Sequence, residues 1–103
     1  MLIRSQNKEL LVNFNVSAGI EIEEETTKTV VTSYITGCSY LLGEYSTKEK
    51  ALKVLDMIQE AYANVELIQM AVQNIGKMFQ KAIGKAIMNK MIFQMPEDSE
   101  VVV

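Results

Sequence analysis

Hydrophobic and polar residues in the first part of the chain follow one another in short alternating runs, which is the pattern of β-strands. In residues 19–23, isoleucine alternates with glutamate, so one face of that strand is apolar and the other is acidic. Residues 29–36 are rich in β-branched and aromatic side chains, which fit the pleated surface of a sheet. Four or five short strands joined by tight turns predict an antiparallel meander. The predicted strands cover residues 2–4, 10–14, 19–23, 29–36 and 40–45.

The pattern becomes helical directly after these strands. Ser46-Thr47-Lys48-Glu49 has the form of a capping box, in which the Ser46 side chain accepts a hydrogen bond from the Glu49 amide and the Glu49 side chain reaches back. Apolar residues then recur at helical spacing along one stripe, and we expect this stripe to cover one face of the sheet. The sequence therefore predicts an α+β fold with two layers. The stripe consists of Ala51, Leu55, Ile58, Tyr62 and Val65.

The helical pattern continues well beyond Val65. As one unbroken helix, residues 47–91 would be roughly 67 Å long, because an α-helix rises about 1.5 Å per residue. A compact chain of this size has a diameter of roughly 35 Å. Either the helix breaks into a hairpin near Asn64 or Gly76, or its excess length packs against another chain. Both alternatives are open at this stage.

The end of the chain is predicted to return to the strands at its start. Residues 92–95 have the character of a short strand, and we expect it to pair with Leu2 and Ile3. Residues 1–95 would then form a single α+β domain, with strands in residues 1–45. The remaining residues, 96–103, are acidic and are expected to form a flexible tail.

The composition changes this picture mainly by exclusion. Ten basic residues against 13 acidic residues give a net charge of −3, which argues against nucleic-acid binding because that requires a basic surface. The chain has no histidine, the commonest general base and metal ligand. It has a single cysteine, which excludes a tetrahedral zinc site and an internal disulfide. We therefore predict no enzymatic activity, no catalytic residue, no metal and no cofactor.

The cysteine and the N-terminal residues bear on localisation. We interpret Cys38 as a small, half-buried residue on a strand, and a single cysteine fits a reducing cytoplasm. Met1-Leu2-Ile3 is followed at once by Arg4, without the apolar region of a secretory signal. No apolar run approaches the ~20 residues that a membrane-spanning helix needs. We expect a soluble, cytoplasmic protein that does not bind membranes.

Three segments of the chain together resemble a known family. They are residues 3–6 (IRSQ), residues 42–62 (LGEYSTKEKALKVLDMIQEAY) and residues 93–96 (FQMP). The chain resembles a family of uncharacterised small proteins from Gram-positive bacteria and their phages or prophages. The resemblance implies a strand-rich half, a capped helix and a closing segment, and it carries no catalytic residue over. An origin on a mobile element would favour a small accessory or host-interaction protein.

The acidic run within residues 21–25 is the first candidate binding surface. Strand alternation places Glu21 and Glu23 on one solvent-facing side, with Glu25 nearby. Such a row would suit a basic partner surface. The simpler interpretation, which we favour, is a solvated strand face whose charges prevent pairing with other chains. The spacing does not match a calcium-binding EF-hand loop.

The helical segment after Val65 is the second candidate. Lys77, Lys81 and Lys85 recur every four residues, and apolar residues fill the opposite side. A basic amphipathic helix of this kind binds a partner protein or an anionic membrane, and we favour a protein. The predicted oligomer interface consists of Ile68, Val72, Ile75, Phe79, Ile83 and Ala86.

These patterns lead to one main functional hypothesis and two alternatives. The first helix already covers much of the sheet, so the apolar side of residues 65–92 needs another surface. We therefore predict a non-catalytic protein–protein interaction module that forms a dimer or higher symmetric oligomer through residues 65–92. The first alternative is a phage- or prophage-encoded inhibitor of a host defence protein, acting through Glu21, Glu23 and Glu25. The second is a small-molecule-binding module with an apolar cavity between sheet and helix.

Overall fold

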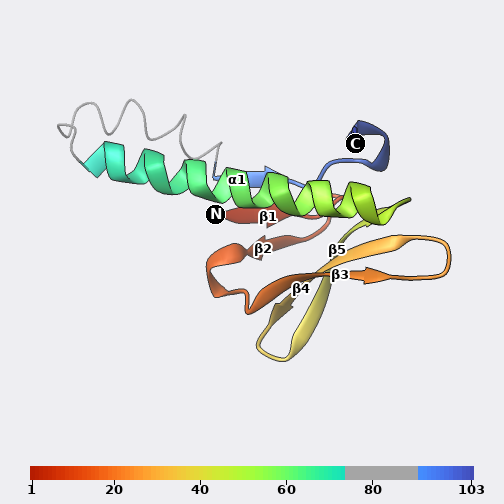
Figure 1. Cartoon of the computed structure of the whole chain (residues 1–103). Coiled ribbons are helices and arrows are strands. Elements are labelled where there is room, and N and C mark those ends of the chain that lie inside the picture. Colours follow the sequence, from red (N-terminus) through yellow and green to blue (C-terminus); the bar gives the residue numbers. More distant parts are fainter. Residues whose placement is uncertain (74–90) are drawn as a thin grey trace.

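The computed structural model describes residues 1–73 and 91–103 (Figure 1). Within these residues the chain has an α+β fold, as predicted, with one long helix that follows a series of strands. The elements are β1 (Leu2–Arg4), β2 (Leu11–Asn13), the 3₁₀-helix η1 (Phe14–Val16), β3 (Gly19–Glu24), β4 (Thr29–Ile35), β5 (Cys38–Tyr45), α1 (Lys48–Gln73), β6 (Ile92–Gln94) and the 3₁₀-helix η2 (Asp98–Glu100).

The larger sheet is the predicted antiparallel meander, in the order β3-β4-β5. β3 pairs with β4 from Gly19 opposite Tyr34 to Glu24 opposite Thr29. A two-residue turn joins β4 to β5, and both of its residues, Thr36 and Gly37, have positive φ angles of 48° and 79°. This is the turn geometry that matches the twist of a hairpin.

β1 and β2 do not extend this meander but form a second sheet with β6, in the order β2-β1-β6. β1 is antiparallel to β2 and parallel to β6. Leu2 lies opposite Ile92 and Ile3 lies opposite Phe93, so the predicted pairing of residues 92–95 with the start of the chain is confirmed. Ile3 is fully buried between its two neighbours and therefore stands at the centre of this small sheet.

The helix α1 packs across β3, β4 and β5 with one apolar face. Its most buried side chains recur at helical spacing and join the core, and Leu55 and Tyr62 of the predicted stripe are partly buried beside them. The predicted break at Asn64 is wrong, because α1 continues through this exposed residue to Gln73 without a proline or glycine. The alternative break at Gly76 lies outside the described residues. The buried side chains of α1 are Ala51, Val54, Ile58 and Val65.

The start of α1 differs from the predicted capping box. Thr47, not Ser46, caps the helix, because its Oγ1 accepts a hydrogen bond from the Lys50 amide at 3.2 Å. The Ser46 amide and hydroxyl instead both donate to Asp98 Oδ1, at 2.8 and 3.0 Å. The predicted capping box is wrong because the Asp98 carboxylate accepts the hydrogen bond from the Ser46 amide that Glu49 was expected to accept.

The segment expected to be a flexible tail packs against the start of α1. Lys50 Nζ lies 3.4 Å from Asp98 Oδ2 and donates to the Asp98 carbonyl oxygen at 2.9 Å. Pro96 is buried, and Val101 is only 5% exposed and belongs to the core. Residues 96–101 are therefore part of the folded unit, whereas Val102 and Val103 are exposed.

The side chain of Gln6 joins the two sheets. Its Oε1 accepts from the Glu44 amide at 2.9 Å, and its Nε2 donates to the carbonyl oxygens of Glu44 and Pro96 at 3.1 Å each. The Gln6 amide also donates to the Leu42 carbonyl oxygen at 2.7 Å. The buried Tyr45 hydroxyl donates to the same Pro96 oxygen at 2.8 Å. Segments 3–6, 42–62 and 93–96 thus meet at one polar junction.

Replacing Gln6 with glutamate tests this junction. Gln6→Glu keeps an acceptor for the Glu44 amide but turns both donated bonds into contacts between oxygen atoms. We expect the free energy of unfolding, measured by urea denaturation, to fall by about 2 kcal/mol. Gln59→Glu, an equivalent change at an exposed position of α1, should change it by less than about 0.5 kcal/mol. Equal effects of both changes would contradict the assigned role of Gln6.

Asp98 provides a test by pH. The hydrogen bond from the Ser46 amide, together with the Ser46 hydroxyl and Lys50, lowers the pKa of Asp98 below its ordinary value of 3.8. A lowered pKa stabilises the fold above the ordinary value, and this stabilisation is lost as the pH falls through the lowered pKa. Asp98→Asn should therefore reduce stability at pH 7 and flatten its decline below about pH 4. Thermal unfolding at several pH values measures both effects. Asp56→Asn, on the exposed side of α1, should change neither the stability at pH 7 nor its decline at low pH.

Candidate functional site

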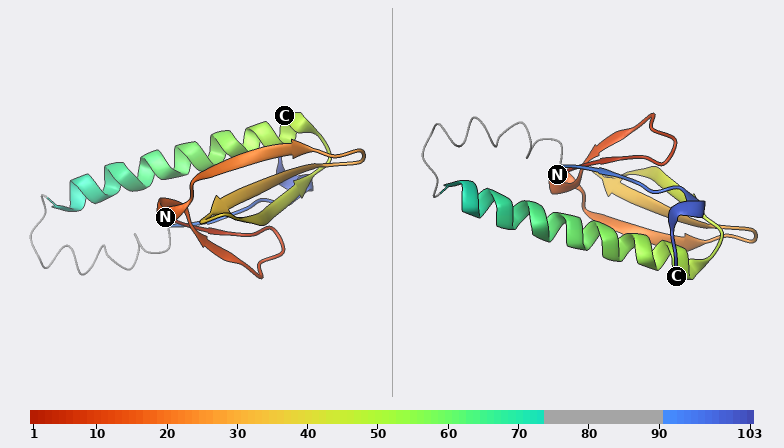
Figure 2. Two further views of the ribbon diagram at one scale, coloured as in Figure 1. Left: turned by 90° about the horizontal axis from the view of Figure 1, so that it is seen from below. Right: turned by 90° about the horizontal axis from the view of Figure 1, so that it is seen from above.

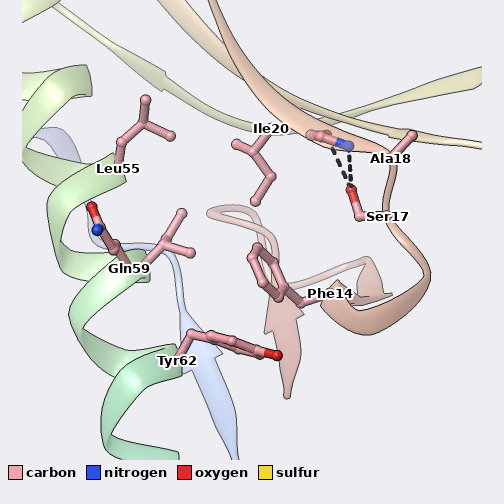
Figure 3. A pocket seen from close by; sticks show the side chains of 9 residues that line it. Phe14, Ser17, Ala18, Ile20, Leu55, Gln59 and Tyr62 are labelled. Atoms are coloured by element: carbon pink, nitrogen blue, oxygen red, sulfur yellow. Dashed lines mark hydrogen bonds between the residues drawn. The ribbon is translucent and has the colours of Figure 1, made fainter. Parts of the chain in front are cut away.

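An open apolar groove lies between α1 and the start of β3 (Figure 3). Its volume is about 410 Å³. Leu55, Gln59 and Tyr62 of α1 stand on one side, and the β3 side is formed by the Ser17–Ile20 segment. The complete lining is Phe14, Ser17, Ala18, Gly19, Ile20, Leu55, Ile58, Gln59 and Tyr62.

Local structure at η1 closes one end of the groove. Asn13 caps this short helix, since its Oδ1 accepts from the Asn15 amide at 3.0 Å. The cap positions the Phe14 ring against the Tyr62 ring, with 5.0 Å between the ring centroids and an angle of 49° between their planes. The tilted aromatic pair forms an apolar end wall.

Two polar side chains of the groove, Ser17 and Tyr62, are already hydrogen-bonded. The Ser17 hydroxyl lies within 3.0 Å of the Gly19 carbonyl oxygen and 2.9 Å from the hydroxyl of buried Ser33. It also accepts from the Gly19 amide at 3.3 Å. A hydrogen bond to Glu66 raises the pKa of Tyr62 above its ordinary value of 10.0. The lining therefore offers apolar contact and neutral polar groups, which suit binding.

The acidic row lies on the other side of β3. Glu21 and Glu23 are exposed and lie opposite Thr32 and Val30 of β4, on the face away from the groove. Neither has an ion-pair partner among the described residues, whereas Glu24 lies 3.5 Å from Lys48. Glu25 follows β3 in the turn to β4, 3.9 Å from Lys28 Nζ. The predicted row is thus present at Glu21 and Glu23, and Glu25 lies beside it in an ion pair.

The predicted oligomer interface falls mostly outside the described residues. Ile68 is half-buried on α1. Val72 belongs to α1, but its side chain lies outside the described part, as do all of Ile75, Phe79, Ile83 and Ala86.

Sequence reasoning missed a second apolar strip on α1. Ala63, Leu67, Met70 and Ala71 are exposed on the side of the helix away from the sheet. Leu67 is 64% exposed and Met70 is 62% exposed. Their spacing of three to four residues is a helical signal, but the stripe that faces the sheet is the stronger periodic pattern in the same residues.

The interpretation of Cys38 as half-buried is wrong. Cys38 opens β5 directly after the Thr36-Gly37 turn and is exposed, because the end of the hairpin extends past the cover that α1 provides. The exposed neighbours Ser39 and Tyr40 follow the same pattern.

Metal, membrane and family features give no further guide to function. Within residues 1–73 and 91–103, no group of three or more histidine, cysteine, aspartate or glutamate side chains is placed to hold a metal ion. No helix in this part of the chain is both long and apolar enough to cross a membrane. Comparison of the chain with protein-family models, with curated proteins and with solved structures finds no match. Function is therefore inferred from the residues and their geometry alone.

Thiol labelling tests the position of Cys38. Because the side chain is exposed, one thiol per chain should react with a bulky aromatic disulfide reagent in buffer as quickly as in denaturant. The absorbance of the released thiolate measures the rate. Labelling that is fast only after unfolding would show that the thiol is covered.

Proposed function

We propose that this chain is a non-catalytic protein–protein interaction module that self-associates through the apolar helical face within residues 65–92. The observation that supports this is the exposed apolar surface of α1 at Leu67 and Met70, beside half-buried Ile68 of the predicted interface. We further propose that it acts in the cytoplasm as a dimer or higher oligomer, without a metal or cofactor.

The last turns of α1 extend beyond the strands beneath it. Its 26 residues extend about 39 Å, whereas the strands beneath it have six to eight residues and extend about 20–27 Å. Figure 1 shows the last turns of α1 beyond the strands. Ala63, Leu67, Met70 and Ala71 lie on the side of the helix that faces away from the sheet, so the described strands do not cover them.

A two-fold arrangement suits this strip. Contiguous exposed apolar surface on a soluble domain commonly marks an interaction site, and two copies of one strip are complementary across a two-fold axis. Leu67 would lie near the centre of such an interface, and Ile68 would flank it. The helices would approach to about 8–10 Å, as in other packed helix pairs.

The two alternatives from the sequence stay predictions. An inhibitor that acts through Glu21, Glu23 and Glu25 requires these side chains to be exposed, and they are. A small-molecule-binding module requires a cavity between sheet and helix, and the groove beside β3 has that position. Neither feature by itself identifies a ligand.

A charge placed in the strip tests self-association. Leu67→Glu should weaken association at least about tenfold, because it buries a carboxylate twice in a symmetric interface. Sedimentation equilibrium at micromolar concentration measures the constant. Leu52→Glu is the matched control, because Leu52 is 45% exposed near the other end of the same helix and should leave association unchanged.

Two results would contradict the proposal. One is a wild-type chain that remains monomeric in light scattering at micromolar concentration. The other is an equal loss of association with Leu67→Glu and Leu52→Glu, which would indicate a general effect on α1.

A further inference from the structure

We propose that β3 is a docking edge for an extended segment of another protein, in which apolar and basic residues alternate, and that this segment adds to the sheet as a further strand beside α1. This interaction is separate from the proposed self-association and uses a different side of the molecule.

The first observation is the position of β3. Among the described strands it pairs with β4 alone and so forms one edge of its sheet. Ile20 and Ile22 are only partly buried, although they face α1. Both views in Figure 2 show α1 running alongside β3. An edge strand and a neighbouring helix are the two walls that a strand-addition site needs.

The second observation is the groove between these walls. It opens beside Ala18, Gly19 and Ile20, and the aliphatic side chains of Leu55 and Ile58 line its helical side. The Phe14–Tyr62 ring pair bounds it at one end. An added strand would direct one large apolar side chain into this space, as pockets beside docking edges do.

The third observation is the charge on the opposite face. Side chains of an added strand alternate between the two faces, so the neighbours of the inserted apolar residue would lie on the side of Glu21 and Glu23. A second hollow of about 350 Å³, lined in part by Gly19, Glu21 and Tyr34, lies at this edge. Lysine or arginine there would supply the counter-charges that Glu21 and Glu23 lack among the described residues.

The same charges argue against a second copy as the occupant. Pairing β3 with β3 of another copy would bring glutamates of the two strands close together, and like charges across strands are destabilising. Glutamates on an edge strand are a usual means of preventing such self-pairing. The negative row equally disfavours nucleic acid. A basic, extended protein segment fits both the backbone edge and the charge.

Binding of a designed peptide tests the proposal. A short fluorescein-labelled peptide in which lysine and valine alternate should bind the full chain saturably, as measured by fluorescence anisotropy. Its affinity should fall with added salt, and amide NMR shifts should concentrate in residues 18–24. Glu21→Lys with Glu23→Lys should reduce the affinity at least about tenfold. Glu9→Lys with Glu60→Lys changes the net charge equally at exposed positions away from the groove and should retain most of the affinity.

Two further controls separate strand addition from general charge attraction. Gln59 lines the groove, so the larger side chain of Gln59→Trp should fill it and abolish peptide binding. An unchanged circular dichroism spectrum would show that the variant is still folded. Two peptides with N-methyl groups on alternate amides complete the test, one for each of the two alternating patterns. The peptide whose methyl groups block the amides that face β3 should bind much more weakly than the other, because it lacks main-chain donors to the edge strand.

Three outcomes would overturn the proposal. The first is equal binding of a peptide of the same composition with its lysines in one block. The second is binding that Gln59→Trp leaves intact. The third is that no peptide binds while a small apolar dye binds in the groove. That result would indicate that the groove binds small molecules.

Discussion

The side-chain amide of Gln6 links the two sheets of this protein. Gln6 offers an acceptor and two donors where the backbones of β5 and the Pro96 segment approach β1, and it satisfies groups from both. Burial raises the pKa of the Tyr45 hydroxyl, which therefore remains a donor to Pro96 at any ordinary pH. These hydrogen bonds, together with the buried bond from Tyr45 to Pro96, join the two sheets at one point.

The same end of the molecule fixes the start of α1. Ser46 and Lys50 both bind Asp98, and Val101 fills the core beside them. The helix is thus anchored at its first turn and crosses the sheet from there. Its later turns leave the sheet, because the strands are shorter than the helix. The exposed strip at Leu67 lies on the outer side of this helix, and the groove lies between the helix and the start of β3.

Much of the fold was predictable from local patterns. Alternation located the meander strands to within one or two residues, and apolar spacing identified the sheet-facing side of α1. The strand at residues 92–95 was also found, since its composition is apolar and extended. The capping box failed for a physical reason, because local spacing cannot report that Asp98 would compete for Ser46. The groove was not predictable residue by residue, since Phe14 and Tyr62 meet only through the tertiary fold.

The parallel pairing of β1 with β6 has a consequence for how the chain is made. The ribosome synthesises Leu2 well before Ile92, and the two must meet before the small sheet exists. The meander and α1 depend on contacts between neighbouring segments and can assemble during synthesis. β1 then lacks one of its two neighbouring strands until β6 has been synthesised. Closing so long a loop costs more conformational entropy than forming a hairpin, so the small sheet depends on the rest of the fold to bring its strands together.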